Sequence, residues 1–255
     1  MPNKKSSKKE KRAAFATPIV NILLESASYT FDFFVDHFRK KWQLTFSPCR
    51  EENSLGMIIE NMVVGCVFVP FPIVENALIQ SARDNVLWPE AEAVVTKHKA
   101  HLKVTLARES DPVSAHILLS KVVYSLLHQK NVVGVYYSPG LFEPAYYIKC
   151  AENLTAKKLP TELWVHINQI GFNTEEGFSF FTSGMNNFNK KEFEIVDTKT
   201  NFIDAYYFLK ELIKFTIENN VNYKDGDIAG IEDNKTPLSV SKGVRVKGPT
   251  IKIGI

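Results

Sequence analysis

F-S-F-F-T-S-G-M-N-N-F-N-K-K-E-F-E-I-V, residues 178–196, decides the fold together with the helical segment that follows it. Residues 178–182 and 192–196 predict two short strands, and the polar residues between them predict an unusually long turn. Asn201 can cap the next helix, which Asn219-Asn220 ends. Two strands followed by an amphipathic helix predict a sheet with a helix packed on it. The apolar stripe of this helix consists of Phe202, Ala205, Leu209, Leu212, Ile213 and Ile217.

Strand and helix patterns also alternate along the rest of the chain. Residues 55–59 and 62–69 predict a hairpin, and residues 100–106 alternate strictly, which predicts a half-buried strand. The class is therefore α+β, with a mainly antiparallel sheet and helices packed on one side. We expect two fused ferredoxin-like halves that share this sheet; one long twisted mixed sheet is the alternative. Further strands are expected at residues 19–24, 132–137 and 163–170, and further helices at 30–40, 72–82, 88–98 and 111–129.

The charge of the chain is unevenly distributed. Six basic residues and one acidic residue lie in the first twelve, which leaves 25 basic and 27 acidic residues in the body. We expect residues 1–14 to be a disordered basic tail, 15–110 an N-terminal α+β half and 111–255 a C-terminal α+β half, the two packed as one compact unit. Nucleic acid is not the expected partner, because no aromatic residues interleave the tail and the body has no positive excess.

Composition also indicates the compartment. No apolar run reaches the roughly 18 residues that a membrane-spanning helix needs, and the N-terminal segment lacks a signal-peptide core and cleavage site. The cysteines Cys49, Cys66 and Cys150 are odd in number and lack C-x-x-C spacing, which predicts reduced thiols. We expect a cytoplasmic protein without a cofactor, and its oligomeric state is left open.

Two acidic residues lie in the second strand of the opening stretch. Glu192 and Glu194 are two residues apart, so they share one face of the strand and could act as general acid and base or as ligands of a hard cation. Lys190 and Lys191 immediately precede them. A solvated face is therefore the favoured interpretation of this pair.

Asp225 and Asp227 form a second acidic pair in the segment D-G-D. This segment resembles the start of a calcium loop, but the remaining ligands do not follow at the required spacing. Carboxylates around a glycine more often accept backbone hydrogen bonds in a turn. With Glu192, Glu194 and His166, these aspartates are the candidate catalytic residues of an enzymatic alternative.

His98 and His101 are the weak candidates for a metal site. Residues three apart in a strand point to opposite faces, so the two imidazoles would not converge on one ion. We therefore expect no metal. The expected binding surface consists of Trp164, Thr182, Glu192 and Glu194.

Five segments carry a resemblance to a known family. They are L-W-P-E-A-E at 87–92, H-K-A-H-L-K-V at 98–104, L-P-T-E-L-W-V-H at 159–166, F-F-T-S-G-M-N-N-F-N-K-K-E-F-E-I at 180–195 and Y-K-D-G-D-I-A-G at 223–230. Together they resemble the bacterial family called domain of unknown function 4261, over residues 87–255 and most strongly after 159. The resemblance implies a shared fold but no reaction, and it associates the chain with toxin-neutralising or other interaction proteins. The chain departs from the family pattern at Asn189, where glycine is more usual, and at Ile228, where threonine is.

No nucleophile elbow, phosphate-binding loop, dinucleotide fingerprint or zinc-protease helix is present in the sequence. We therefore expect a non-enzymatic protein-binding module, of a toxin-neutralising or immunity type if it follows the resemblance. The alternative is a hydrolase or metal-assisted enzyme that uses clustered carboxylates of the C-terminal half. The mutual positions of the candidate side chains distinguish these two hypotheses.

Overall fold

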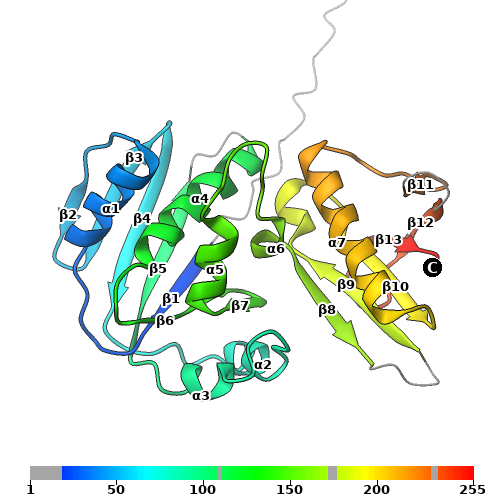
Figure 1. The fold of residues 1–255 in the computed structure, drawn as a ribbon, viewed down its shortest axis with the longest axis horizontal. Coiled ribbons are helices and arrows are strands. Elements are labelled where there is room, and N and C mark those ends of the chain that lie inside the picture. The colour runs from blue at the N-terminus through cyan, green and yellow to red at the C-terminus, as the bar shows by residue number, and fades with distance from the viewer. Residues whose placement is uncertain (1–18, 108–110, 172–176, 231–234) are drawn as a thin grey trace, which may run out of the picture.

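The computed structural model describes residues 19–107, 111–171, 177–230 and 235–255. The expected basic tail, residues 1–14, lies outside the described residues. The class is α+β, as expected, but the strands form two separate sheets instead of the expected shared one. Figure 1 shows these sheets side by side, with the long helices α4 and α7 on the same side of the molecule.

The first sheet has seven strands in the order β2-β3-β4-β5-β1-β6-β7, all antiparallel. Its expected hairpin is confirmed: Glu60 and Asn61 form the two-residue loop between β3 and β4, with φ angles of 49° and 66°. Two positive φ angles are the geometry that matches the twist of paired strands. The strands are β1 (Ile19–Leu24), β2 (Cys49–Glu51), β3 (Ser54–Ile59), β4 (Met62–Val69), β5 (Ala100–Ala107), β6 (Val132–Tyr137) and β7 (Gly140–Phe142).

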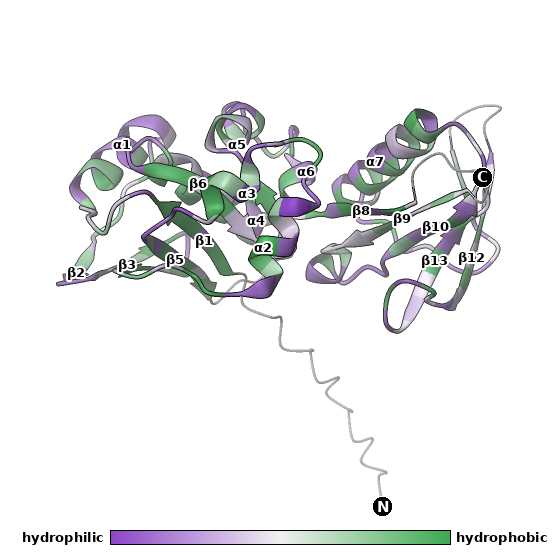
Figure 2. Cartoon of the chain, turned by 90° about the horizontal axis from the view of Figure 1, so that it is seen from below, coloured by the Kyte–Doolittle hydropathy of each residue, from purple (hydrophilic) through white to green (hydrophobic). Residues whose placement is uncertain are grey.

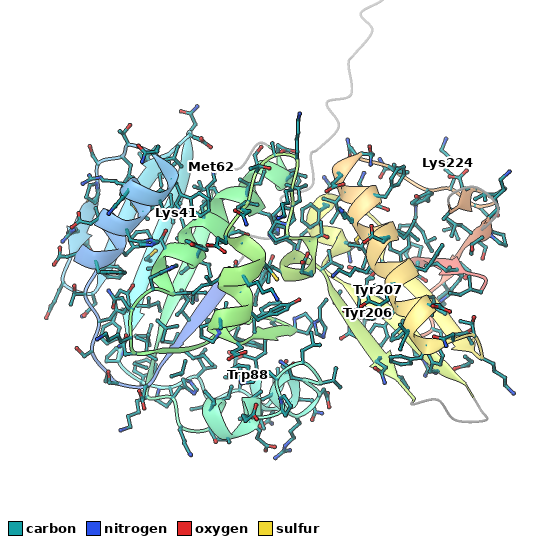
Figure 3. The ribbon with its side chains drawn as sticks, viewed as in Figure 1. Lys41, Met62, Trp88, Tyr206, Tyr207 and Lys224 are labelled. Carbon is teal, nitrogen blue, oxygen red and sulfur yellow. The ribbon has the colours of Figure 1, made fainter. Side chains whose placement is uncertain are left out.

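Helices cover the two faces of this sheet unequally. Helices α1, α4 and α5 pack on one face, whereas α2 and α3 cover only one end of the other, where Trp88 anchors a small apolar cluster with Leu23 and Tyr136 (Figure 3). The N-cap of α4 is Asp111, whose carboxylate accepts a hydrogen bond from the Ser114 amide at 2.8 Å. The helices are α1 (Asp32–Trp42), α2 (Asn76–Arg83), α3 (Ala91–Val95), α4 (Pro112–Leu126) and α5 (Pro144–Ala151).

The second sheet has six strands in the order β11-β12-β13-β10-β9-β8 and is mixed, because β10 and β13 are parallel. The expected helix is α7 (Phe202–Glu218), and Asn201 caps it by accepting hydrogen bonds from the amides of Ile203 and Asp204. The strands are β8 (His166–Ile170), β9 (Phe178–Ser183), β10 (Phe193–Thr198), β11 (Ile228–Ala229), β12 (Thr236–Lys242) and β13 (Pro249–Ile253), and the short 3-10 helix η1 (Met185–Phe188) joins β9 to β10.

Two sequence expectations about the middle of the chain need correction. Residues 163–170 are not one strand, because the Leu163 and Val165 amides bond to the Pro160 and Thr161 carbonyls, which makes α6 (Thr161–Trp164) a helical turn before β8. The change of sheet also falls after Phe142, not at residues 110/111. The reason is long-range pairing: β6 pairs with β1, and β7 with β6.

The two sheets share one contiguous hydrophobic core. It extends from Val20 in the first sheet to Ile253 in the second. We call the region where the two sheets meet the seam. There, the indole nitrogen of Trp164 donates a hydrogen bond to Ser120 Oγ of α4 at 2.8 Å. Both sheets are therefore held against each other by buried side chains as well as by the chain itself.

Candidate functional site

Glu192 is buried directly before β10. It is 4% exposed. Its carboxylate accepts a hydrogen bond from the Thr182 hydroxyl at 2.6 Å and from the amides of Gly184, Met185 and Asn186 at 3.1, 3.3 and 3.2 Å. The three amides are consecutive in the chain and lie at the start of η1. Glu192 thus fixes the long turn between β9 and β10.

Glu194 is fully buried in β10 and fixes a different loop. Its carboxylate accepts hydrogen bonds from the amides of Val244, Arg245 and Val246, at 3.1, 2.8 and 2.8 Å. The Thr250 hydroxyl donates to it at 3.0 Å, and Lys252 forms an ion pair with it. Because the amides belong to the β12–β13 loop, Glu194 holds this loop against the sheet.

The expected solvated face at Glu192 and Glu194 is therefore wrong. Each carboxylate accepts hydrogen bonds from three successive backbone amides and one threonine hydroxyl, and Glu194 has Lys252 in addition. Successive amides form a concave site for an anion and compensate the loss of hydration that burial imposes on a carboxylate. The two glutamates serve different loops, so they do not share a site.

Burial raises the pKa of the Glu192 carboxyl above its usual range, while the hydroxyl and amide donors act in the opposite direction. A raised pKa means that the folded state takes up a proton at higher pH than the unfolded state does. Stability from this group is therefore present below the unfolded pKa and is lost as the pH rises through the folded pKa.

The D-G-D segment forms the expected turn. Asp227 accepts a hydrogen bond from the Lys224 amide at 2.7 Å, and Asp225 accepts one from the Val240 amide at 2.7 Å. Both carboxylates bond to backbone at the β11–β12 end of the sheet. They do not join Glu192 or Glu194 in a common hydrogen-bond network among the described residues.

His98 and His101 both bind the backbone of the extended segment after β4. His98 Nε2 accepts a hydrogen bond from the Ile73 amide at 2.8 Å, and His101 Nδ1 donates to the Phe71 carbonyl at 3.0 Å. Each ring thus has a structural partner. Over the part of the chain that the structure describes, no group of three histidine, cysteine, aspartate or glutamate side chains could hold a metal ion.

Trp164 and Thr182 are interior residues. Trp164 stacks on Phe188 of η1, and the Thr182 hydroxyl accepts a hydrogen bond from the Phe193 amide at 2.8 Å while it donates to Glu192. With both glutamates also buried, the four residues of the expected binding surface lie inside the fold. Of the four, Trp164 alone lines a pocket, so they do not form an exposed binding surface.

A small pocket lies at the seam between the sheets, and His166 is part of its wall. Its volume is about 20 Å³, which is room for about one water molecule. Burial lowers the pKa of His166, so its imidazole is neutral at pH 7. The pocket is lined by Tyr137, Ser138, Pro139, Gly140, Phe142, Leu163, Trp164, His166, Ser183, Gly184 and Asn187.

A buried hydrogen-bond chain crosses the same seam. His116 Nδ1 donates to the Pro112 carbonyl at 2.8 Å, and its Nε2 accepts from the Tyr137 hydroxyl at 3.1 Å. The Asn187 side-chain amide donates to that hydroxyl at 3.1 Å. Burial lowers the pKa of His116 to about 4 and raises that of Tyr137 to about 12. Sequence reasoning missed these residues, because they lie on three different elements and no spacing connects them.

Most of the second sheet, without β8, matches a known family model. Residues 181–254 match the family model described as "Domain of unknown function (DUF4261)". The matched segment contains Glu192, Glu194 and both loops that they hold. It also contains Asn189, whose φ is 56°, a left-handed conformation that asparagine tolerates better than most residues do.

No curated protein and no solved structure matches the chain. Among the described residues, no helix is long and apolar enough to cross a membrane. The matched family carries no assigned activity in its description, so a function must be argued from the surfaces of this molecule.

Proposed function

We propose that this chain is a protein-binding module that docks its partner on the outward face of the first sheet. We call this surface the open face. Its positions follow from the register, in which Ile58 pairs with Val63, Gly56 with Gly65 and Ser54 with Val67. On the next strand, β5, Ala107, Thr105 and Lys103 pair with Val63, Gly65 and Val67. Ile19 and Asn21 of β1 in turn pair with Thr105 and Lys103.

The composition of the open face is the observation that carries this proposal. An antiparallel sheet with one solvated face normally places polar residues there. Here the positions are mainly aliphatic or glycine, and the ionic groups are Lys103 and, on the edge strand β2, Glu51, which pairs with Ser54. Ile58, Val67 and Ile19 are 63%, 43% and 42% exposed. A contiguous exposed apolar surface of this kind is typical of an interaction site.

The surroundings leave the open face accessible on the described part of the chain. Figure 2 shows α1, α4 and α5 on one side of the first sheet and no helix over β2, β3 and β5 on the other. Gly56 and Gly65 keep the centre of the face flat. Lys103 forms no ion pair among the described residues, which favours a partner whose apolar surface carries a carboxylate, because an unpaired cation is costly to bury.

The enzymatic alternative lacks a comparable observation. The carboxylates of Glu192, Glu194, Asp225 and Asp227 accept hydrogen bonds from the protein itself. His166 faces a pocket with room for about one water molecule. Neither arrangement offers a free acid–base pair beside space for a substrate. A toxin-neutralising role is one form of the binding function, with the added requirement that binding inactivates the partner.

The test compares capture of proteins from cell extract by the wild type and by the double variant Ile58→Glu/Val67→Glu. Both positions are exposed, so the added charges alter the surface and leave the core intact. The matched control is Ser239→Glu/Ser241→Glu, at exposed positions of β12 in the second sheet. We expect a protein that the wild type and the control capture and the open-face variant loses. Equal capture by all three would exclude the open face.

A further inference from the structure

Strand β8 differs from the other edge strands of the described residues in length and charge. β2, β7 and β11 form the remaining sheet edges and have three, three and two residues. β2 also carries Arg50 and Glu51. β8 has five residues, H-I-N-Q-I, without a charge or a proline. Natural proteins protect sheet edges by short strands, charged side chains or proline, and β8 has none of these protections.

The outer edge of β8 pairs with no other strand among the described residues. Its residues are partly exposed, and Ile170 at its end is 43% exposed. The Asn168 amide group bonds inward to β9, donating to the Phe181 carbonyl at 3.1 Å and to Ser183 Oγ at 2.9 Å. Within the described ranges, the backbone of β8 bonds only to β9. Peptide groups on its other side therefore point away from the sheet.

The seam pocket adjoins the first residue of this edge. His166 begins β8 and also lines the pocket, and its cross-strand neighbour Ser183 lines it as well. Tyr137 and Asn187 complete a polar but un-ionised wall. A strand laid along β8 would bring one of its side chains to this pocket, and only a small side chain fits there. Main-chain pairing with one shaped pocket is how sheet-edge recognition combines affinity with specificity.

We propose that β8 binds an extended protein segment by adding it as a seventh strand to the second sheet. The segment is uncharged where it pairs and carries a small residue at the seam pocket. This site is separate from the open face, so the proposal stands independently of the function argued above. The strand order places the added segment between β8 and the first sheet, beside β7 (Figure 1).

The experiment selects binders from a displayed library of random twelve-residue linear peptides on the full chain. Each binder is then N-methylated at one amide at a time. Alternate residues of a strand direct their N–H groups to the same side, so we expect affinity to fall about tenfold or more at every second amide and to stay unchanged at the others. Replacement of one residue by tryptophan should abolish binding only at the position that reaches the pocket.

Variants of the chain locate the peptide. Gln169→Lys places a charge on the edge and should weaken binding about tenfold, whereas Ser239→Lys on the inner strand β12 and Ile58→Glu on the open face should leave it unchanged. The proposal is overturned if N-methylation is tolerated throughout, or if Gln169→Lys binds like the wild type. It is also overturned if the free chain is a dimer that Gln169→Lys converts to a monomer, because a second copy would then occupy the edge.

Discussion

The outward faces of the two sheets differ in charge and in covering. The open face of the first sheet is mainly aliphatic, with Lys103 and the edge residue Glu51 as its ionic groups, and none of the described helices lies over most of it (Figure 2). The corresponding face of the second sheet carries Glu194 with Thr250 and Lys252, and the β12–β13 loop folds over it. A buried carboxylate binds backbone amides and so holds a loop in place. The open face has no such carboxylate at its centre, and no loop of the described residues is held across it in this way.

The largest expected effect comes from removal of the carboxylate that closes the second sheet. Glu194→Ala leaves three amides without their acceptor and Lys252 without its counter-ion. Breaking a buried ion pair from one side costs about 3–5 kcal/mol, and we expect a loss of that order in the free energy of unfolding. Urea denaturation followed by circular dichroism measures it. The control is Asp225→Ala, at an exposed turn carboxylate, which should cost much less. Equal losses would mean that Glu194 does not hold the loop.

Protonation of His116 at the seam between the sheets should lower the free energy of unfolding in acid. The pKa of His116 is lowered from 6.5 to about 4, so the unfolded state binds its proton first as the pH falls. Stability is therefore present above pH 6.5 and is lost between pH 6.5 and 4. The shift corresponds to about 3 kcal/mol. Urea midpoints across this range should fall less steeply in His116→Asn, which keeps a polar group but does not titrate. Parallel pH profiles of the two proteins would contradict this prediction.

A smaller effect is expected at the other carboxylate of the second sheet. Glu192→Gln keeps the size of the side chain but puts an amide donor among the donors of η1. One or two unsatisfied hydrogen bonds cost about 1–3 kcal/mol. Hydrogen exchange of the Gly184, Met185 and Asn186 amides should accelerate in this variant, while the amides of Val244 to Val246 stay protected. Loss of protection in both loops would show that the glutamates act together.

The smallest effect on stability is expected on the open face itself. Ile58→Thr and Val67→Thr keep a β-branched side chain at an exposed position, so the free energy of unfolding should change by about 0.5 kcal/mol or less. Retention on a hydrophobic-interaction column should nevertheless decrease, because apolar surface has been removed. Thr105→Ser, which removes only one methyl group, serves as the control. A large loss of stability in the threonine variants would mean that these side chains are packed within the protein.

Local patterns predicted much of the fold. The hairpin at residues 55–69, the helix cap at Asn201 and the D-G-D turn depend on residues a few positions apart, and all three are confirmed. Trp164 shows where local reasoning failed. An apolar residue in an alternating run predicts a strand, but the backbone bond to Thr161 placed this segment in a helical turn.

The sequence by itself determined the α+β class, the main hairpin, the helix capped by Asn201 and the side of β10 that Glu194 occupies. The helices expected at 72–82 and 88–98 are shorter than expected, at Asn76–Arg83 and Ala91–Val95. Tertiary structure decided that the strands form two sheets, that His116, Tyr137 and Asn187 meet at the seam, and that both glutamates are buried. The physical reason is the range of the interactions. Alternation along a strand specifies which face a side chain occupies. Which segment covers that face depends on residues far away in the sequence. For Glu194 the covering amides lie about fifty residues later.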